Sequence, residues 1–395
     1  MYEIKKVGGG VCAPEGFYAG AASAGLRPNG ADDVAFIYAD TPCEAAAVFT
    51  TNKMTAAPIR HFRAKGAFKT NFILMNAKNA NAMTGPAGIA DIDEILGELQ
   101  SQYGGLVNPV MSSTGVIGVR LPKEKIIGAA KTFDLNTRDS LAAAKAIMTT
   151  DTFFKMVSTE VVLEGGKRFR IGAIAKGAGM INPAMATMLC FVTTDADADA
   201  DALQSALDEV TPTTFNAASV DGDTSTNDTV MLLSNRKSGA FDAEAFKAAL
   251  HAMLLELAQM MVSDGEGATK MVTFQVTGAL NNDEAETAAK ALSNSLLMKT
   301  AIYGEDPNWG RVASTIGASG VVCDEATLTI RFDEVCVYEK GTILFDEEME
   351  KKAAAVMKRE RFTISCDLGQ GEGAFDAYGC DLGHEYVKIN ADYRT

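Results

Sequence analysis

Thr187 stands between a loop of small residues and an apolar run, in the segment KGAGMINPAMATMLCFVTTDA (176–196). A threonine at the N-terminus of a chain carries its own base, because an α-amino group has a pKa of about 7.7–8.0 and can accept the hydroxyl proton. The chain can create that terminus if the Thr187 hydroxyl attacks the carbonyl carbon of Ala186 and water hydrolyses the resulting ester. The residues permit this chemistry, but a β-branched residue that opens an ordinary strand fits them too.

Other catalytic arrangements find little support in the sequence. The three histidines, His61, His251 and His384, lie outside any recognisable catalytic motif, and HExxH, GxSxG and GxxxxGK[ST] patterns are missing. The seven cysteines include no CxxC pair, which argues against a zinc site or a disulfide framework. We therefore expect no metal, no tightly bound cofactor and a cytoplasmic location.

Composition and charge narrow the class of protein further. The 395 residues are 47% apolar and 22% charged, enough to bury a substantial core. A net charge of −15 argues against binding to nucleic acids or anionic membranes, and no apolar run approaches the roughly 20 residues of a membrane span. Residues 1–186 carry 20 Lys and Arg against 16 Asp and Glu, whereas residues 187–395 carry 16 against 35. The imbalance reflects acidic helix faces or two polypeptides that attract each other.

The elements that must position Thr187 alternate along the chain. Residues 158–177 predict a β-hairpin with its turn at Gly165 and Gly166, and a strand follows Thr187. Helical spacing predicts helices over about 199–210 and 241–262. We therefore expect mixed α/β layers, with a domain boundary near 278–283.

Several segments, in order along the whole chain, resemble the ArgJ family of glutamate N-acetyltransferases, also called ornithine acetyltransferases. Besides the region around Thr187 they are GGVCAPEGFYAGAASAGL (9–26), VFTTNKMTAAPI (48–59), SSTGVIG (112–118), IMTTDTFFK (147–155), VSDGEGATK (262–270), KTAIYGEDPNWGR (299–311) and GCDLGHEYVKINADYRT (379–395). Two positions depart from the family pattern: Lys78 stands where glycine is expected, and Tyr378 where tryptophan is common.

The resemblance implies a particular architecture. Cleavage between Ala186 and Thr187 gives an α chain (1–186) and a β chain (187–395), which stay associated as an α2β2 heterotetramer. The α chain and residues 187–280 form an αββα sandwich like that of DmpA-type aminopeptidases. Residues 281–395 form a smaller C-terminal α/β domain, and a strand in YVKIN (386–390) is expected to anchor the tail.

The resemblance also implies a reaction and its residues. Thr187 takes the acetyl group of N2-acetylornithine and passes it to glutamate, so that ornithine and N-acetylglutamate leave in a ping-pong cycle of arginine biosynthesis. Some members also accept acetyl-CoA, and the residues do not decide whether this chain does. The family's oxyanion hole matches Thr114 and Gly115, and its substrate-contacting positions match Thr150, Lys176, Glu266, Asn390 and Thr395.

Two other functions fit the same residues. A self-processing aminopeptidase or amidase of the DmpA type would hydrolyse the ester on Thr187 instead of passing it to an amine. A non-catalytic amino-acid-binding regulator would keep the chain uncut.

Overall fold

A single long strand, β3 (Val34–Phe49), joins the two sheets of the larger domain. The structure is a computed structural model, and it describes residues 1–182 and 188–392. The first part of β3 pairs with β2 and β4, whereas residues 44–49 pair antiparallel with β9. Because β3 changes partners along its length, its two parts belong to two different layers.

The first sheet has the order β1-β6-β7-β8-β9-β3, and the second joins β2, β3, β4 and β5. Apart from β3, the strands are β1 (Tyr2–Lys6), β2 (Phe17–Ala22), β4 (Thr70–Asn76), β5 (Val110–Ser113), β6 (Lys155–Leu163), β7 (Arg168–Lys176), β8 (Leu189–Thr194) and β9 (Thr229–Ser234). Strands β8 and β9 are parallel, and β7 runs antiparallel to β8 with Lys176 opposite Leu189. The end of β7 therefore lies beside the start of β8.

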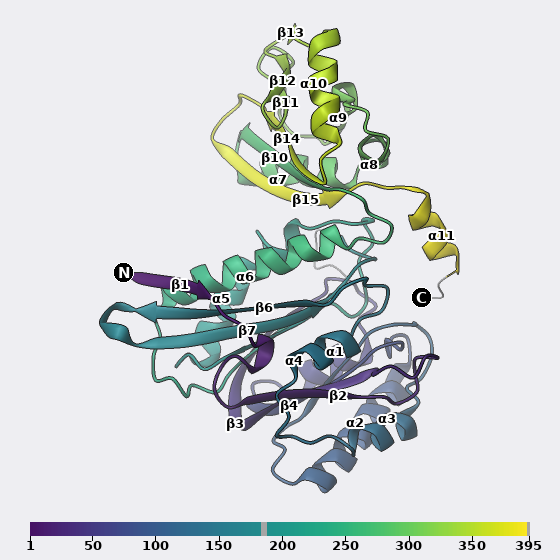
Figure 1. Cartoon of the computed structure of the whole chain (residues 1–395), viewed down its shortest axis with the longest axis vertical. Helices are drawn as coiled ribbons and strands as arrows, with labels where there is room; N and C mark the ends of the chain where they lie inside the picture. The colour runs from purple at the N-terminus through teal and green to yellow at the C-terminus, as the bar shows by residue number, and fades with distance from the viewer. Residues whose placement is uncertain (183–187, 393–395) are drawn as a thin grey trace.

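Helices cover the outer face of each sheet (Figure 1). Helices α5 and α6 pack on the first sheet, and α2 and α3 on the second, while a third apolar cluster with residues of α4 fills the space between the sheets. The helices in the described part of this domain are α1 (Ala57–Ala64), α2 (Gly85–Tyr103), α3 (Lys123–Ala130), α4 (Ser140–Ala146), α5 (Ala200–Val210) and α6 (Ala243–Ser263). This order of layers confirms the predicted αββα sandwich.

Local patterns placed the elements around residue 187 correctly. Strands β6 and β7 form the predicted hairpin, and Gly165 and Gly166 at its turn both have positive φ, a conformation that glycine adopts without strain. Helices α5 and α6 begin where expected, because the side chains of Asp199 and Asp242 accept hydrogen bonds from the third residue beyond them.

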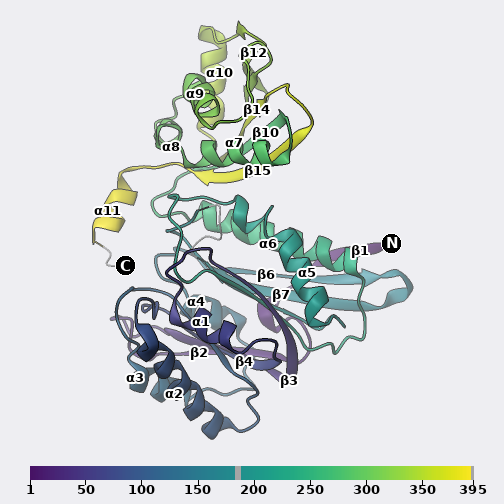
Figure 2. The same ribbon diagram turned by 180° about the vertical axis from the view of Figure 1, so that it is seen from behind.

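Helix α6 is not an unbroken apolar run, but by length and composition alone it is apolar enough to cross a membrane. Within the fold its apolar residues, including Leu250, Leu254 and Leu257, are fully buried against the first sheet. Figure 2 shows α6 lying beside α5 over that sheet. The apolar composition of α6 is thus accounted for by its place in the core.

The second domain surrounds a six-stranded sheet of order β13-β12-β11-β14-β10-β15. Its elements are β10 (Met271–Ala279), α7 (Asn282–Asn294), α8 (Leu296–Tyr303), α9 (Trp309–Ala318), β11 (Thr329–Phe332), β12 (Val335–Glu339), β13 (Thr342–Ile343), α10 (Glu347–Met357), β14 (Arg361–Asp367) and β15 (Gly373–Cys380). Strand β10 precedes the boundary expected near 281, so that boundary is one strand too late. The reason is that β10 pairs with β14 and β15, far along the chain.

The tail returns to the larger domain as a helix. Residues His384–Asp392 form α11, so the strand expected in YVKIN (386–390) is wrong. Figure 1 shows α11 standing apart from the six-stranded sheet, on the side toward the larger domain. The helix brings Tyr386 and Asn390, four residues apart, onto one face.

Candidate active site

A cavity of about 180 Å³ brings together residues from distant parts of the chain. It is lined by all the predicted site residues that the structure describes, namely Thr114, Gly115, Thr150, Lys176, Glu266 and Asn390. The other predicted positions, Ala186, Thr187 and Thr395, lie outside the described residues. The roles assigned to these residues remain predictions, but their expected proximity is met for these six.

The Thr114–Gly115 pair follows β5 and packs directly on another loop. The Thr114 N–H donates to Asn76 O (3.0 Å), and the Val116 N–H donates to Lys78 O (3.2 Å). Gly115 has φ +135°, and a Cβ there would lie 2.2 Å from the carbonyl carbon of Lys78. Only glycine permits this approach. Among the described residues neither the Gly115 N–H nor the Thr114 hydroxyl has a hydrogen-bond partner, so both can serve a ligand.

Lys176 brings a positive charge to the cavity from the end of β7. Its side chain is almost fully buried, and its Nζ lies 3.9 Å from Asp151 Oδ2. Burial lowers the pKa of Lys176 below its ordinary value; the carboxylate of Asp151 opposes this shift and the cation of Lys155 reinforces it. A buried ammonium without a hydrogen bond to the described residues is suited to a substrate carboxylate.

Glu266 and Asn390 meet across the cavity wall. Asn390 Nδ2 donates to Glu266 Oε2 (2.8 Å), and the Glu266 N–H donates to Ala178 O (2.8 Å). Gly179 lies beneath the Glu266 carboxylate, where a Cβ would come within 2.5 Å of it. Helix α11 thus reaches the cavity through Asn390, although a residue so near the end of a chain is usually poorly ordered.

The sequence analysis missed several residues of this site. Asp221 and Tyr386 line the cavity, and the Tyr386 hydroxyl donates to Asp221 Oδ2 (3.2 Å). Asp221 also accepts the backbone N–H groups of Met180 (2.6 Å) and Ile181 (2.9 Å). Burial raises the pKa of the Asp221 carboxyl. The polar run DGDTSTNDT (221–229) before a buried strand was the available signal.

Asp228, at the end of that run, is fully buried next to the start of β8. Its Oδ1 accepts the N–H of Met188 (3.1 Å), the residue that follows Thr187, and its Oδ2 has no partner among the described residues. Burial raises the pKa of this carboxyl well above its usual range. Asn227 beside it donates to Ala80 O (2.6 Å) and Ser113 O (2.8 Å), which ties β9 to the loops around Gly115.

The charges at the cavity suit a small zwitterion. Lys176 supplies one cation, while Asp221, Asp223 and Glu266 supply carboxyl groups. An amino acid carries both a carboxylate and an ammonium group, so each sign of charge in the cavity has a counterpart on such a ligand. Within residues 1–182 and 188–392 no group of three His, Cys, Asp or Glu is placed to hold a metal ion.

The sequence matches one family model and curated relatives along most or all of its length. The model of the ArgJ family matches residues 18–395. The "Arginine biosynthesis bifunctional protein ArgJ" of Wolinella succinogenes is 59% identical over the full length of both chains, and that of Ruegeria pomeroyi is 45% identical over 94% of this chain and 93% of its own. A crystal structure of the ArgJ protein of Bacillus halodurans, 40% identical, covers 51% of this chain and 98% of its own with a TM-score of 0.49.

Proposed function

The chain belongs to the ArgJ family and is an acyltransferase of arginine biosynthesis, and from this premise we propose that it moves acetyl from N2-acetylornithine to glutamate. Thr187 is the nucleophile, and it gains its free amine when the chain cleaves itself after Ala186. The observation that carries the proposal is that Thr114, Gly115 and Lys176 line one cavity together with Thr150, Glu266 and Asn390.

Self-cleavage comes first in this proposal. The Thr187 hydroxyl attacks the carbonyl carbon of Ala186, the C–N bond breaks as the hydroxyl proton passes to the nitrogen, and the peptide becomes an ester on Thr187 with a free α-amine. Water then hydrolyses that ester, which leaves a carboxylate on Ala186 and restores the hydroxyl of Thr187. The anchoring of Met188 to the carboxyl of Asp228 supports this step, because it fixes the backbone immediately after the reacting residue.

The transfer then proceeds in two halves. The Thr187 amine accepts the hydroxyl proton as Oγ attacks the acetyl carbon of N2-acetylornithine, and the Thr114 hydroxyl and Gly115 N–H donate to the oxyanion. The amide C–N bond breaks, the proton passes to the ornithine nitrogen, and an acetyl ester remains. The amine of glutamate attacks that ester, loses a proton, and restores the Thr187 hydroxyl as N-acetylglutamate leaves.

The two charged ends of N2-acetylornithine have counterparts in the cavity. Lys176 pairs with the α-carboxylate that N2-acetylornithine and glutamate share, and Glu266 pairs with the distal ammonium of ornithine. Thr150 and Asn390 contact the substrate beside them, and Thr395 belongs to this set by resemblance. The cycle uses no metal and no tightly held cofactor. The cytoplasmic location and the α2β2 assembly remain predictions that belong to the same proposal.

A second acetyl donor would extend the cycle. The relatives are named bifunctional, and acetyl-CoA as donor would make N-acetylglutamate directly. The test is to give the purified protein glutamate with either acetyl-CoA or N2-acetylornithine and to measure N-acetylglutamate. Product from both donors indicates two activities, and product from N2-acetylornithine alone indicates one. Release of free acetate instead of N-acetylglutamate, or of free amino acids from peptides, would indicate the hydrolase alternative.

Intact mass spectrometry with and without N2-acetylornithine tests the proposal. We expect two fragments divided between Ala186 and Thr187, with one acetyl group on the second. Thr187→Ala should stay uncut and lose activity on the order of 10⁶-fold, as when a catalytic nucleophile is removed. Thr187→Ser keeps hydroxyl and amine and is the matched control. An uncut native chain with full activity, or a Thr187→Ala protein that still exchanges acetyl groups, would refute it.

A further inference from the structure

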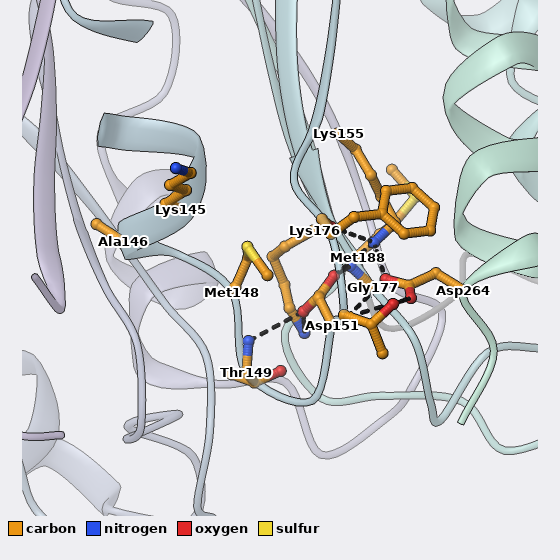
Figure 3. A network of polar contacts seen from close by, with 12 residues as sticks. Lys145, Ala146, Met148, Thr149, Asp151, Lys155, Lys176, Gly177, Met188 and Asp264 are labelled. Carbon is orange, nitrogen blue, oxygen red and sulfur yellow. Dashed lines mark hydrogen bonds and ion pairs between the residues drawn. The ribbon is translucent and has the colours of Figure 1, made fainter. Parts of the chain in front are cut away.

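Four charged side chains form a buried cluster behind the cavity (Figure 3). Asp151, Lys155, Lys176 and Asp264 are each no more than 3% exposed, and their formal charges cancel. Lys155 lies between the two carboxylates, with Nζ 2.8 Å from Asp151 Oδ1 and 2.6 Å from Asp264 Oδ2. Buried charges are costly unless they are paired and hydrogen-bonded, so this arrangement needs a reason beyond packing.

Asp151 already accepts three hydrogen bonds from donors other than Lys176, one of them from the ammonium of Lys155. Its Oδ1 accepts from Lys155 Nζ and from the Gly177 N–H (2.7 Å), and its Oδ2 accepts from the Thr149 N–H (2.9 Å). Lys176 Nζ lies 3.9 Å from Oδ2, beyond hydrogen-bond distance, and it makes no hydrogen bond to the described residues. The ammonium group therefore feels the negative charge of Asp151 while its N–H groups remain available to the cavity.

Asp264 holds Lys155 in its place. Besides Lys155 Nζ, its carboxylate accepts the Thr152 N–H (3.1 Å) and the Thr152 hydroxyl. Asp264 caps the end of α6, whereas Lys155 begins β6, so the contact joins the helix layer to the strand next to β7. In the proposed cleaved protein it also joins the α chain to the β chain.

We propose that Lys155 and Asp264 are positioning residues: by occupying Asp151, they keep the Lys176 ammonium directed at the α-carboxylate of the substrate. This inference rests on the proposed function. If Lys155 loses its charge, Asp151 loses its hydrogen-bonded cation, and the cation left beside it is Lys176, 3.9 Å from Oδ2. The ammonium then closes on Asp151 and withdraws from the ligand.

The charged groups around Lys176 define a second consequence. They are Asp151, Glu266 and Asp228, which favour its protonated form, and Lys155, which disfavours it. Removing the charge of Lys155 therefore raises the pKa of Lys176. A simple packing defect at residue 155 has no such directional effect, so the alkaline limb of the pH profile separates the two explanations.

The decisive variant is Lys155→Met combined with Asp264→Asn. Lys155→Met alone leaves two carboxylates facing one cation and can fail to fold, whereas the double variant has a neutral cluster again. We expect it to fold, to raise KM for N2-acetylornithine about 10- to 100-fold with a smaller change in kcat, and to shift the alkaline limb of kcat/KM upward. That size corresponds to one lost charge-assisted hydrogen bond.

Two comparisons sharpen the test. Lys6→Met removes an exposed ion pair with Glu256 (2.7 Å), which likewise joins β1 to α6, and should leave KM unchanged. N2-acetylornithine amide lacks the α-carboxylate, so the double variant and the native protein should use it equally poorly. A folded double variant with native KM and native pH profile would overturn the inference. Absence of acetyl transfer by the native protein would refute the proposed function instead.

Discussion

The two domains bury different kinds of side chains. Within residues 271–380 the described core is almost wholly apolar, built around residues such as Phe274, Ile330 and Phe332, and its buried polar side chains are Ser293, Lys299 and Thr329. The larger domain buries many more polar groups, and those nearest the cavity include Lys155, Lys176 and Asp228. Because a buried polar group costs free energy unless it is paired, the larger domain depends more than the smaller one on internal hydrogen bonds and ion pairs, including those beside the cavity.

The buried lysine of the smaller domain clarifies the comparison. Lys299 Nζ donates to Cys380 O (2.6 Å), and the Leu382 N–H donates to Lys299 O (3.1 Å). These bonds fix the chain where β15 leaves the six-stranded sheet and leads to α11. The buried Lys299 therefore fixes the segment that connects the smaller domain to α11, the helix that carries Asn390 to the cavity.

The largest expected effect is a loss of stability, with activity retained, when an aromatic ring is removed from the core of the smaller domain. Phe332→Ala deletes a fully buried ring of β11, and such deletions cost about 3–5 kcal/mol. We expect a lower free energy of unfolding in urea but a near-native kcat for the folded fraction. Ile343→Ala, at an exposed position, is the control and should change stability little. A large fall in kcat for folded Phe332→Ala would contradict the division of labour between the domains.

A single methyl group added at the cavity should instead lower kcat. Gly115→Ala places a Cβ against the Lys78 backbone at a positive φ, so the loop must shift and the oxyanion donor with it. Loss of one such donor typically costs about 10²–10³ in kcat. Steady-state kinetics measure this loss, and Gly118→Ala, where a Cβ meets no atom within 4 Å although φ is also positive, controls for backbone strain. Equal kcat in the two variants would argue against Gly115 as a donor.

The smallest expected effect concerns pH and stability. His61 is buried on α1 with Nε2 3.1 Å from Asp93 Oδ1, and burial, reinforced by Lys65, lowers its pKa although Asp93 opposes the shift. The unfolded chain therefore binds a proton more readily than the folded one. The free energy of unfolding should be unaffected above about pH 6.5 and fall as pH drops below it.

The His61→Gln variant should lose that part of the slope between pH 7 and 5, as measured by chemical denaturation at several pH values. Residues 271–380 contain no histidine, so the smaller domain should add nothing to this particular dependence. Identical slopes for the native protein and His61→Gln would show that the buried ring does not contribute.

Local patterns predicted those parts of the fold that short-range contacts decide. The glycine pair at 165–166 indicated the hairpin, and Asp199 and Asp242 marked the starts of two helices. The tail was mispredicted because YVKIN fits both a strand and a helix, and only its contacts with the larger domain select the helix. The boundary near 281 was misplaced because β10 finds its partners about a hundred residues later.

Lys78, near the site, also shows what the sequence could predict and what it could not. Its backbone has φ +68°, in the left-handed region that favours glycine, which accounts for the glycine expected there from the family pattern. The sequence identified the departure but could not show that this backbone supports Gly115. Lys78 and Gly115 are far apart in the sequence, and they come into contact because β4 pairs with β5.

By itself the sequence determined the family, the order of most elements and the residue types that acyl transfer requires, because these follow from local spacing and from motifs. Only the tertiary structure decided that Lys176 lies beside an Asp151 already paired with Lys155, that α11 reaches the cavity, and that the Asp228 carboxylate accepts the N–H of Met188, the residue after Thr187. Those facts depend on distances between side chains far apart in the chain, and the free energies of burial and charge pairing that set them exist only once the layers have packed.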